Sequence, residues 1–319
     1  MKILPLALLF ALAFAADAMA EPWSEREVTV DGGLAPLHGT LTLPEGDGPV
    51  DAALILPGSG PTDRNGNFPE GNNNSLRLLA RSLGDAGIAS LRIDKRGVGA
   101  SAQAAPKEED LRAETYVDDA VQWLEFLDKE PRIRRLYLIG HSEGALLATL
   151  AAQKKPVAGL VLIAAIGRPA PDVLREQVAT GNMEPQLRQA SDTILAKLER
   201  GETHEEVPGQ LDALYRPSVQ PYLISWFKYD PAAELAKLSM PVLLIRGTHD
   251  LQVRQADADA LAAARPDATL LAIEEMNHVL KIAPADRAEN IRFYSDPGAP
   301  LAPGLADAIT DFISKMTAP

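Results

Sequence analysis

The stretch IGHSEGALLATLAA, residues 139–152, places Ser142 between two glycines. The apolar run LYLIG (136–140) predicts a buried strand before the serine, and EGALLATLAAQ favours a helix after it. A serine in the pattern G-x-S-x-G at such a turn is typical of a nucleophile elbow, where glycines let the chain pass closely. The alternative is a serine that only caps the helix. The choice depends on whether the chain also supplies a base and an acid.

Apolar runs on both sides of this stretch predict the fold class. REVTV (26–30) and LHGTLTLP (37–44) are expected to pair as an antiparallel hairpin. The later runs are mostly continuously apolar, as is typical of strands buried on both faces of a parallel sheet, and they lie at 52–58, 89–94, 136–140, 159–165, 241–247 and 268–274. Helical periodicity lies between several of them. The sequence therefore predicts an α/β fold with a mostly parallel central sheet and helices on both faces.

The interval 168–238 contains no strand pattern but several helical stretches. It follows the strand predicted at 159–165, at the sheet edge where α/β proteins bind ligands. We therefore expect a helical lid over the site, inserted into a core formed by residues 21–167 and 239–319. An insertion that only adds packing is the alternative.

The first twenty residues have the pattern of a secretory signal peptide. Lys2 precedes an apolar run at 3–16, and Ala18-Met19-Ala20 offers a small-x-small cleavage site. The apolar run is shorter than the roughly 20 residues that a membrane span needs. We therefore expect export to the periplasm or the extracellular space, with no membrane span in the mature chain. A retained amphipathic or anchoring segment is the alternative.

Composition narrows the partners and the chemistry. The chain of 319 residues has no cysteine, which excludes a disulfide framework, a thiol nucleophile and a cysteine-ligated metal. Its net charge of −13 argues against nucleic acid or an anionic membrane as a partner. The sequence has neither an HExxH motif nor a phosphate-cradling loop, so we expect no metal and no organic cofactor. The oligomeric state stays open.

A serine nucleophile needs a base, and the chain has five histidines. His278 follows the last predicted strand and is the best-placed base, with an ordinary loop histidine as the alternative. His38 lies on the predicted hairpin, and His141 is beside the serine but is expected to point away from its hydroxyl. His204 lies in a charged turn of the lid, and His249 is beside an aspartate after a strand.

The base needs an acid to hold its tautomer and stabilise the imidazolium. Asp250 lies just past a buried strand, where its carboxylate can reach the site. Glu274 and Glu275 are closer to His278 in sequence, but we expect both to lie within the end of a strand, so they are weaker candidates. The predicted roles then follow the chain order Ser142, Asp250, His278, which favours the nucleophile over the helix cap.

The negative oxygen formed during attack by a serine needs two donors. The Glu143 backbone N–H, at the start of the helix, is the first. We expect the second from the turn GSGPTDRNG (58–66), with the Ser59 N–H as the choice and Gly60 as the fallback. A tight turn with no such role is the alternative.

Charged residues in two loops have open roles. Asp63 and Arg64 follow the oxyanion turn, and Asp94 and Arg96 follow a predicted strand. Ion pairs that brace the loops are the simpler interpretation, and Arg64 or Arg96 orienting a substrate is the other. The Glu143 side chain either complements the helix dipole or anchors one of these arginines.

An aromatic cluster lies near the end of the predicted lid. Such a cluster either fixes a helix to the core or forms the wall of an acyl pocket. Its members are Tyr215, Tyr222, Trp226, Phe227 and Tyr229.

Five motifs carry a resemblance to a known family: GSGPTDRNG, IDKRGVGAS, GHSEG, KYDP and GTHDLQV. Together and in this order they resemble bacterial secreted carboxylesterases of the α/β-hydrolase superfamily, in a group often placed with serine aminopeptidases. The likeness covers most of the mature chain and is weakest at 170–215. It implies the α/β-hydrolase fold and a triad of Ser142, Asp250 and His278, the residues chosen above.

The expected function is therefore a serine carboxylesterase that hydrolyses short- to medium-chain esters through an acyl-enzyme, with a small ester as substrate. A serine peptidase, such as an aminopeptidase, would use the same triad but would need an acidic site for a free amine. The lid residues Glu202, Glu205 and Glu206 are weak candidates for that site. A silent binding module on this scaffold would show an incomplete triad.

Overall fold

The computed structural model describes residues 21–181 and 183–316. The predicted signal peptide, residues 1–20, lies outside this part of the chain. Among the described residues, no helix combines the length and the apolar character that a membrane crossing requires.

Within the described residues, eight strands form one sheet in the order β1-β2-β4-β3-β5-β6-β7-β8. β1 and β2 pair antiparallel, β2 pairs antiparallel with β4, and the remaining pairs are parallel. The strands are β1 (Trp23–Val30), β2 (Leu37–Pro44), β3 (Val50–Leu56), β4 (Ala89–Ile93), β5 (Ile133–His141), β6 (Gly159–Ile163), β7 (Val242–Gly247) and β8 (Thr269–Ile273). The predicted hairpin and the predicted mostly parallel sheet are confirmed.

Helices cover both faces of this sheet. The main ones are α1 (Ser75–Asp85), α2 (Ala113–Asp128), α3 (Glu143–Lys154), α8 (Pro231–Leu235), α9 (Gln255–Ala264) and α11 (Leu305–Lys315). In β3, Ala52 and Leu54 pack with the layer of α2, α3, α8 and α9, whereas Ala53 and Ile55 pack with the layer of α1 and α11. Because both faces are covered, the central strands β3 to β7 are buried along most of their length. The edge strand β8, expected to be buried on both faces, is instead mostly exposed, because no strand of the described chain pairs with its outer side.

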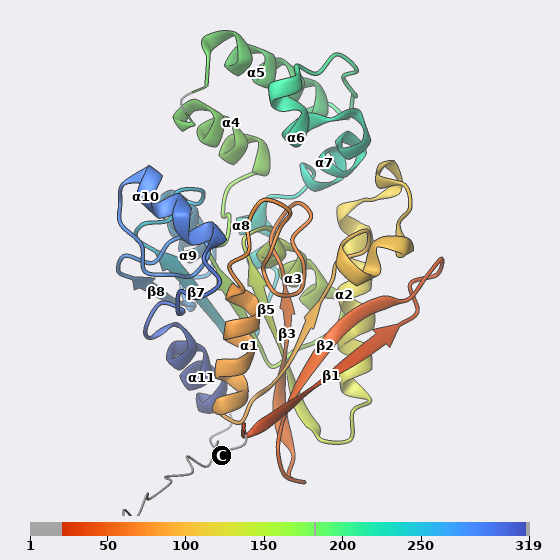
Figure 1. The fold of residues 1–319 in the computed structure, drawn as a ribbon, viewed down its shortest axis with the longest axis vertical. Helices are drawn as coiled ribbons and strands as arrows, with labels where there is room; N and C mark the ends of the chain where they lie inside the picture. The colour runs from red at the N-terminus through yellow and green to blue at the C-terminus, as the bar shows by residue number, and fades with distance from the viewer. Residues whose placement is uncertain (1–20, 182, 317–319) are drawn as a thin grey trace, which may run out of the picture.

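The interval 168–238 contains helices and, among its described residues, no strand. Its first elements, which we call the cap helices, are α4 (Ala170–Thr180), α5 (Pro185–Glu199), η3 (Gly209–Leu211), α6 (Asp212–Tyr215), η4 (Pro217–Val219) and α7 (Gln220–Trp226). Figure 1 shows α4 to α7 above the carboxyl ends of the central strands. α7 packs on α2, and α8 packs beside the sheet on α3 and α9.

Short elements fill the loops at the same edge of the sheet. They are η1 (Gly99–Ala104) and η2 (Glu108–Asp110) between β4 and α2, and α10 (Arg287–Arg292) and η5 (Phe293–Ser295) after β8. The strands β3, β4, β5, β7 and β8 lie in one parallel array, so their carboxyl ends meet at this edge. The loops that leave them carry, in turn, Ser59, Lys95, Ser142, Asp250 and His278.

Candidate active site

Ser142 lies on a strained turn between β5 and α3. Its φ of 55° and ψ of −121° are a combination that a non-glycine residue adopts only when its surroundings enforce it. The flanking glycines make the turn possible, because a side chain on Gly140 would overlap the backbone of Gly144, and one on Gly144 would overlap the carbonyl oxygens of Leu56 and Pro57. The strand, strained serine and helix therefore have the geometry of a nucleophile elbow.

Asp250 and His278 form a buried pair at the neighbouring strand ends. The Nδ1 of His278 lies 2.8 Å from Oδ2 of Asp250, and the other carboxylate oxygen accepts hydrogen bonds from the Gln252 and Val253 amides. Burial alone would raise the pKa of Asp250, but the histidine and the two amides outweigh it, and the pKa lies below its ordinary value. An ionised acceptor keeps the proton on Nδ1 and leaves Nε2 free to accept one.

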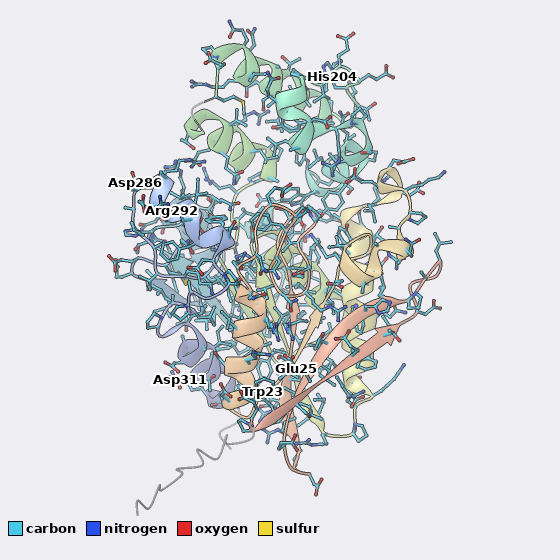
Figure 2. All side chains as sticks on the ribbon, viewed as in Figure 1. Trp23, Glu25, His204, Asp286, Arg292 and Asp311 are labelled. Atoms are coloured by element: carbon cyan, nitrogen blue, oxygen red, sulfur yellow. The ribbon has the colours of Figure 1, made fainter. Side chains whose placement is uncertain are left out.

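The rival acids and bases lie elsewhere. Glu274 and Glu275 do not lie within the end of a strand as expected, because β8 ends at Ile273 and both follow it in a turn. Both are exposed, and Glu274 accepts a hydrogen bond from the Thr248 hydroxyl. Figure 2 shows His204 high on the cap, away from the strand ends. His249 bonds through Nδ1 to the Ala283 carbonyl at 2.6 Å. These positions support the choice of Asp250 and His278.

His141 is buried beside His278 and holds its backbone. Its Nε2 donates to the His278 carbonyl oxygen at 2.8 Å, and the centroids of the His141 and His278 rings are 4.9 Å apart. Burial, and then the proximity of His278, lowers the pKa of His141 from 6.5 to about 4. We expected this ring to point away from the Ser142 hydroxyl and assigned it no role. The hydrogen bond to the His278 carbonyl indicates a structural role, because it holds the loop that carries the predicted base.

We expect His141→Gln to reduce the loss of stability in mild acid. The unfolded chain takes up a proton here near pH 6.5 and the folded protein only near pH 4, so the stability from this group is complete above pH 6.5 and is lost as the pH falls towards 4. By about pH 4.5 the loss is about 2–3 kcal/mol, at about 1.4 kcal/mol per pKa unit. Glutamine retains a donor for the His278 carbonyl but does not titrate. Urea unfolding of both proteins at about pH 7.5 and about pH 4.5 measures the difference. Equal losses in the two proteins would contradict this origin.

Both predicted oxyanion donors are available. The N–H groups of Glu143 and Ser59 have no hydrogen-bond partner among the described residues, and both residues line a cavity with Ser142. The N–H of the fallback residue, Gly60, is likewise unpartnered within that part of the chain. An amide without a partner next to a nucleophile is what a developing oxyanion requires.

The Glu143 side chain bonds neither predicted arginine. It is buried, and its carboxylate lies 3.4 Å from the Nζ of Lys95 and accepts a hydrogen bond of 2.7 Å from the Tyr222 hydroxyl on α7. Lys95 was not among the residues predicted from the sequence, although its neighbours Asp94 and Arg96 were. Its position directly after β4, at the edge where the site residues gather, was the signal that could have identified it.

Arg64 and Arg96 both make bracing contacts. Arg64 bonds to Glu27, Thr40 and Asp94, and it does not line either of the cavities beside Ser142. These contacts support the ion-pair interpretation for Arg64.

Arg96 forms a two-bond pair with Asp119, at 3.0 and 2.6 Å, and also donates to the Gly32 and Ala104 carbonyls. It does line one of the cavities beside Ser142, but with its guanidinium occupied by these partners. Asp63 caps its own turn by accepting from the Asn65 and Asn67 amides.

Ser142 lines two cavities among the described residues, and most of their other lining residues differ. The cap cavity, of about 360 Å³, lies between the cap helices and the core, and its lining includes Glu143, Ile166, Val173, Leu174, Leu223 and Trp226. The histidine cavity, of about 320 Å³, is lined by residues that include Phe68, His278, Val279 and Tyr294. Ser59 and Ser142 line both. The serine therefore lies at the junction of two spaces that can receive the two halves of a substrate.

The aromatic cluster divides between the two predicted roles. Tyr222 and Trp226 line the cap cavity. Tyr215 is buried within the cap, where its hydroxyl lies 2.9 Å from that of Ser191, and Tyr229 donates to Glu114 on α2. Part of the cluster thus faces the cavity and part attaches the cap.

Comparison with known proteins places this geometry in a family. A model of the alpha/beta hydrolase family matches residues 53–291, most of the chain. The chain belongs to the alpha/beta hydrolase family. It is also 30% identical over 274 residues to the esterase EstD of Thermotoga maritima, and the match covers 82% of this chain and 61% of EstD. The chain thus spans about three fifths of the length of this relative.

Solved structures share the fold at low identity. Est1E of Butyrivibrio proteoclasticus, in a complex with ferulic acid, has a TM-score of 0.62 and 16% identity, over 92% of this chain and all of that one. A proline iminopeptidase of Mycobacterium smegmatis has a TM-score of 0.60 and 16% identity, over 91% and 98% of the two chains. The α/β-hydrolase fold is therefore confirmed. Because a proline iminopeptidase shares it, the fold by itself does not choose between esters and peptides.

Proposed function

We propose that this protein is a serine carboxylesterase that hydrolyses short- to medium-chain esters. The observation that carries the proposal is the strained Ser142 on the elbow, which lies at the same edge of the sheet as the paired Asp250 and His278. The unpartnered amides of Glu143 and Ser59 lie at the same edge. Four separated loops, those after β3, β5, β7 and β8, supply the parts of one acyl-transfer site.

The proposed reaction has two halves. His278 accepts the proton of Ser142 as the hydroxyl attacks the ester carbonyl, and the Glu143 and Ser59 amides stabilise the oxyanion. The same histidine then donates the proton to the leaving alcohol, and an acyl-enzyme remains. Water, deprotonated by His278, attacks this acyl-enzyme, and His278 returns the proton to the Ser142 oxygen as the bond to the acyl carbon breaks and the acid leaves. Asp250 orients the ring and stabilises the imidazolium throughout.

The position of the proposed base indicates which half of the ester each cavity would hold. The leaving oxygen must receive its proton from His278, so the alcohol half of the ester belongs in the histidine cavity, which His278 lines. The acyl half then belongs in the cap cavity, which His278 does not line. Its side chains from α4 and α7 suit an apolar chain of modest length.

The charges of the cap cavity favour an ester over an aminopeptidase substrate. The carboxylates that line it belong to Glu108 and Glu143. Glu108 pairs with Arg216 and accepts from the Ser218 hydroxyl, and Glu143 is held by Lys95 and Tyr222. A free amine would find both carboxylates occupied. Of the lid acids, Glu202 pairs with Arg200 and does not line the cavity.

We expect Leu174→Trp to shorten the acyl chain that the protein accepts. Leu174 is half-buried on α4 and lines the cap cavity, so an indole there takes up space for the acyl group. Methyl octanoate and heptyl acetate are isomers with the long chain on opposite sides of the ester. For methyl octanoate, kcat/KM should fall by about tenfold, because about two methylenes lose burial worth about 0.8 kcal/mol each.

The control substrate and the control variant make this test specific. Heptyl acetate should be hydrolysed within about twofold of the wild-type rate, because its chain lies in the other cavity. Leu34→Trp changes a leucine that is 77% exposed and should affect neither ester. An equal loss for both isomers would contradict the assignment of the cavities.

The proposed activity itself is tested by labelling and a substrate panel. A fluorophosphonate probe should modify Ser142, and p-nitrophenyl esters from acetate to palmitate should be hydrolysed with an optimum at short to medium length. Aminoacyl and dipeptidyl amides should be poor substrates. Preferential cleavage of the amides would replace the esterase with a peptidase.

A further inference from the structure

Lys95 is a buried cation between the two proposed oxyanion donors. Only 3% of the residue is exposed. Its Nζ donates to the Gly58 carbonyl oxygen at 2.6 Å, lies 3.4 Å from the Glu143 carboxylate, and sits 5.4 Å from the centre of the Tyr116 ring. The mechanism proposed above assigns no role to this lysine, although it lines the cap cavity together with Ser142.

The bond to Gly58 has a direct consequence for Ser59. The Gly58 C=O and the Ser59 N–H belong to the same peptide group, which is planar and, like all peptide bonds in the described chain, trans. The two bonds therefore point in opposite directions, and holding the oxygen fixes where the hydrogen points. A cation on the oxygen also polarises the peptide, which makes the N–H a stronger donor.

Glu143 connects the lysine to the second donor. Its backbone N–H is the other proposed oxyanion donor, and its carboxylate holds the ammonium that anchors Gly58. Burial lowers the pKa of Lys95, while Glu143 opposes the shift and favours the charged form. On its other side the carboxylate accepts from Tyr222 on α7, so the cap helices complete the support. One buried network thus spans both donors.

We propose that Lys95 is a positioning residue of the oxyanion hole, which sets and polarises the Ser59 N–H through the Gly58 carbonyl and is itself held by Glu143. This role rests on the proposed serine-hydrolase function and adds a residue to that site. Because oxyanion donors act on the transition state, losing the anchor lowers kcat and leaves substrate binding largely intact.

The test compares Lys95→Met with the double variant Lys95→Met/Glu143→Gln. The single variant leaves a buried carboxylate without its cation, which is destabilising, whereas the double variant removes both charges and keeps the volume. With p-nitrophenyl butyrate, both folded variants should lose about 10²–10³-fold in kcat, as loss of one oxyanion donor does, with KM within about threefold. Lys154→Met, an exposed lysine at the far end of α3, is the matched control and should retain wild-type kinetics.

Two further measurements separate positioning from simple loss of structure. A trifluoromethyl ketone, which forms an oxyanion on Ser142, should lose affinity by the same factor as kcat/KM. The rate of fluorophosphonate labelling should also fall in the double variant, because phosphonylation builds charge on an oxygen in the same place.

Three results would overturn the proposal in different ways. Wild-type kcat and labelling rate in a folded double variant would overturn the role of Lys95 alone. A wild-type protein in which the probe fails to label Ser142 would overturn the serine-hydrolase function, and the role of Lys95 with it. A loss confined to KM would also contradict positioning, because it would show that the lysine contributes to ground-state binding.

Discussion

We expect Ser142→Ala to lower kcat for p-nitrophenyl butyrate by about 10⁵–10⁶-fold, the scale seen when a serine nucleophile is removed from a hydrolase. The alanine cannot form the acyl-enzyme, so only catalysis by the oxyanion donors and by binding remains. The Ser142 hydroxyl makes no hydrogen bond within the described residues, so its loss costs little stability. The unfolding midpoint in urea should stay close to that of the wild type.

Labelling and a matched control complete the Ser142 test. The fluorophosphonate probe should label the wild type at Ser142 and should not label the alanine variant. Ser24→Ala, at an exposed position on β1, is the control and should leave kcat unchanged. Residual labelling of Ser142→Ala, or a kcat near that of the wild type, would remove the serine from the proposed mechanism.

We expect Asp250→Asn to lower kcat by about 10²–10⁴-fold. The carboxylate accepts from the Nδ1 of His278 at 2.8 Å, and a neutral amide neither stabilises the imidazolium nor enforces the same tautomer. Burial makes the loss larger, because solvent cannot replace the missing charge at a site that is almost fully enclosed. Steady-state kinetics across a range of pH measures the effect.

Glu274→Gln is the matched control for Asp250→Asn. It makes the same change from acid to amide at the exposed rival, whose carboxylate contacts the Thr248 hydroxyl. Its activity should stay within about twofold of the wild type, as is usual for a surface substitution. If Glu274→Gln or Glu275→Gln does the greater damage, the acid of the site lies on the β8 loop.

The elements of the fold were predictable because their signals are local. Continuous apolar runs mark strands buried on both faces, and glycines two residues on either side of Ser142 mark a turn that tolerates no side chain there. The serine, the acid and the histidine each follow a predicted strand, and their order along the chain identified the candidate site. The parallel sheet then brings the ends of these three strands to one edge.

The contacts around the site were not predictable in the same way. Lys95 meets Glu143 across 48 residues of sequence, and Tyr222 meets the same carboxylate across 79. No periodicity encodes these pairs. They depend on strand order, which places β4 beside β3 and so Lys95 beside Gly58, and on the packing of α7 against α2.

The sequence by itself determined the strands, the elbow and the candidates for the three catalytic roles, because each of these features depends on the residue types within a short segment of the chain. The tertiary structure alone decided the partners of the charged and polar groups. It joined Arg64 to Asp94 and Arg96 to Asp119, gave His141 the His278 carbonyl, and put Lys95 between the two proposed oxyanion donors. The physical reason is that a buried polar group must find a partner wherever the fold brings one within hydrogen-bond distance, whatever the separation along the chain.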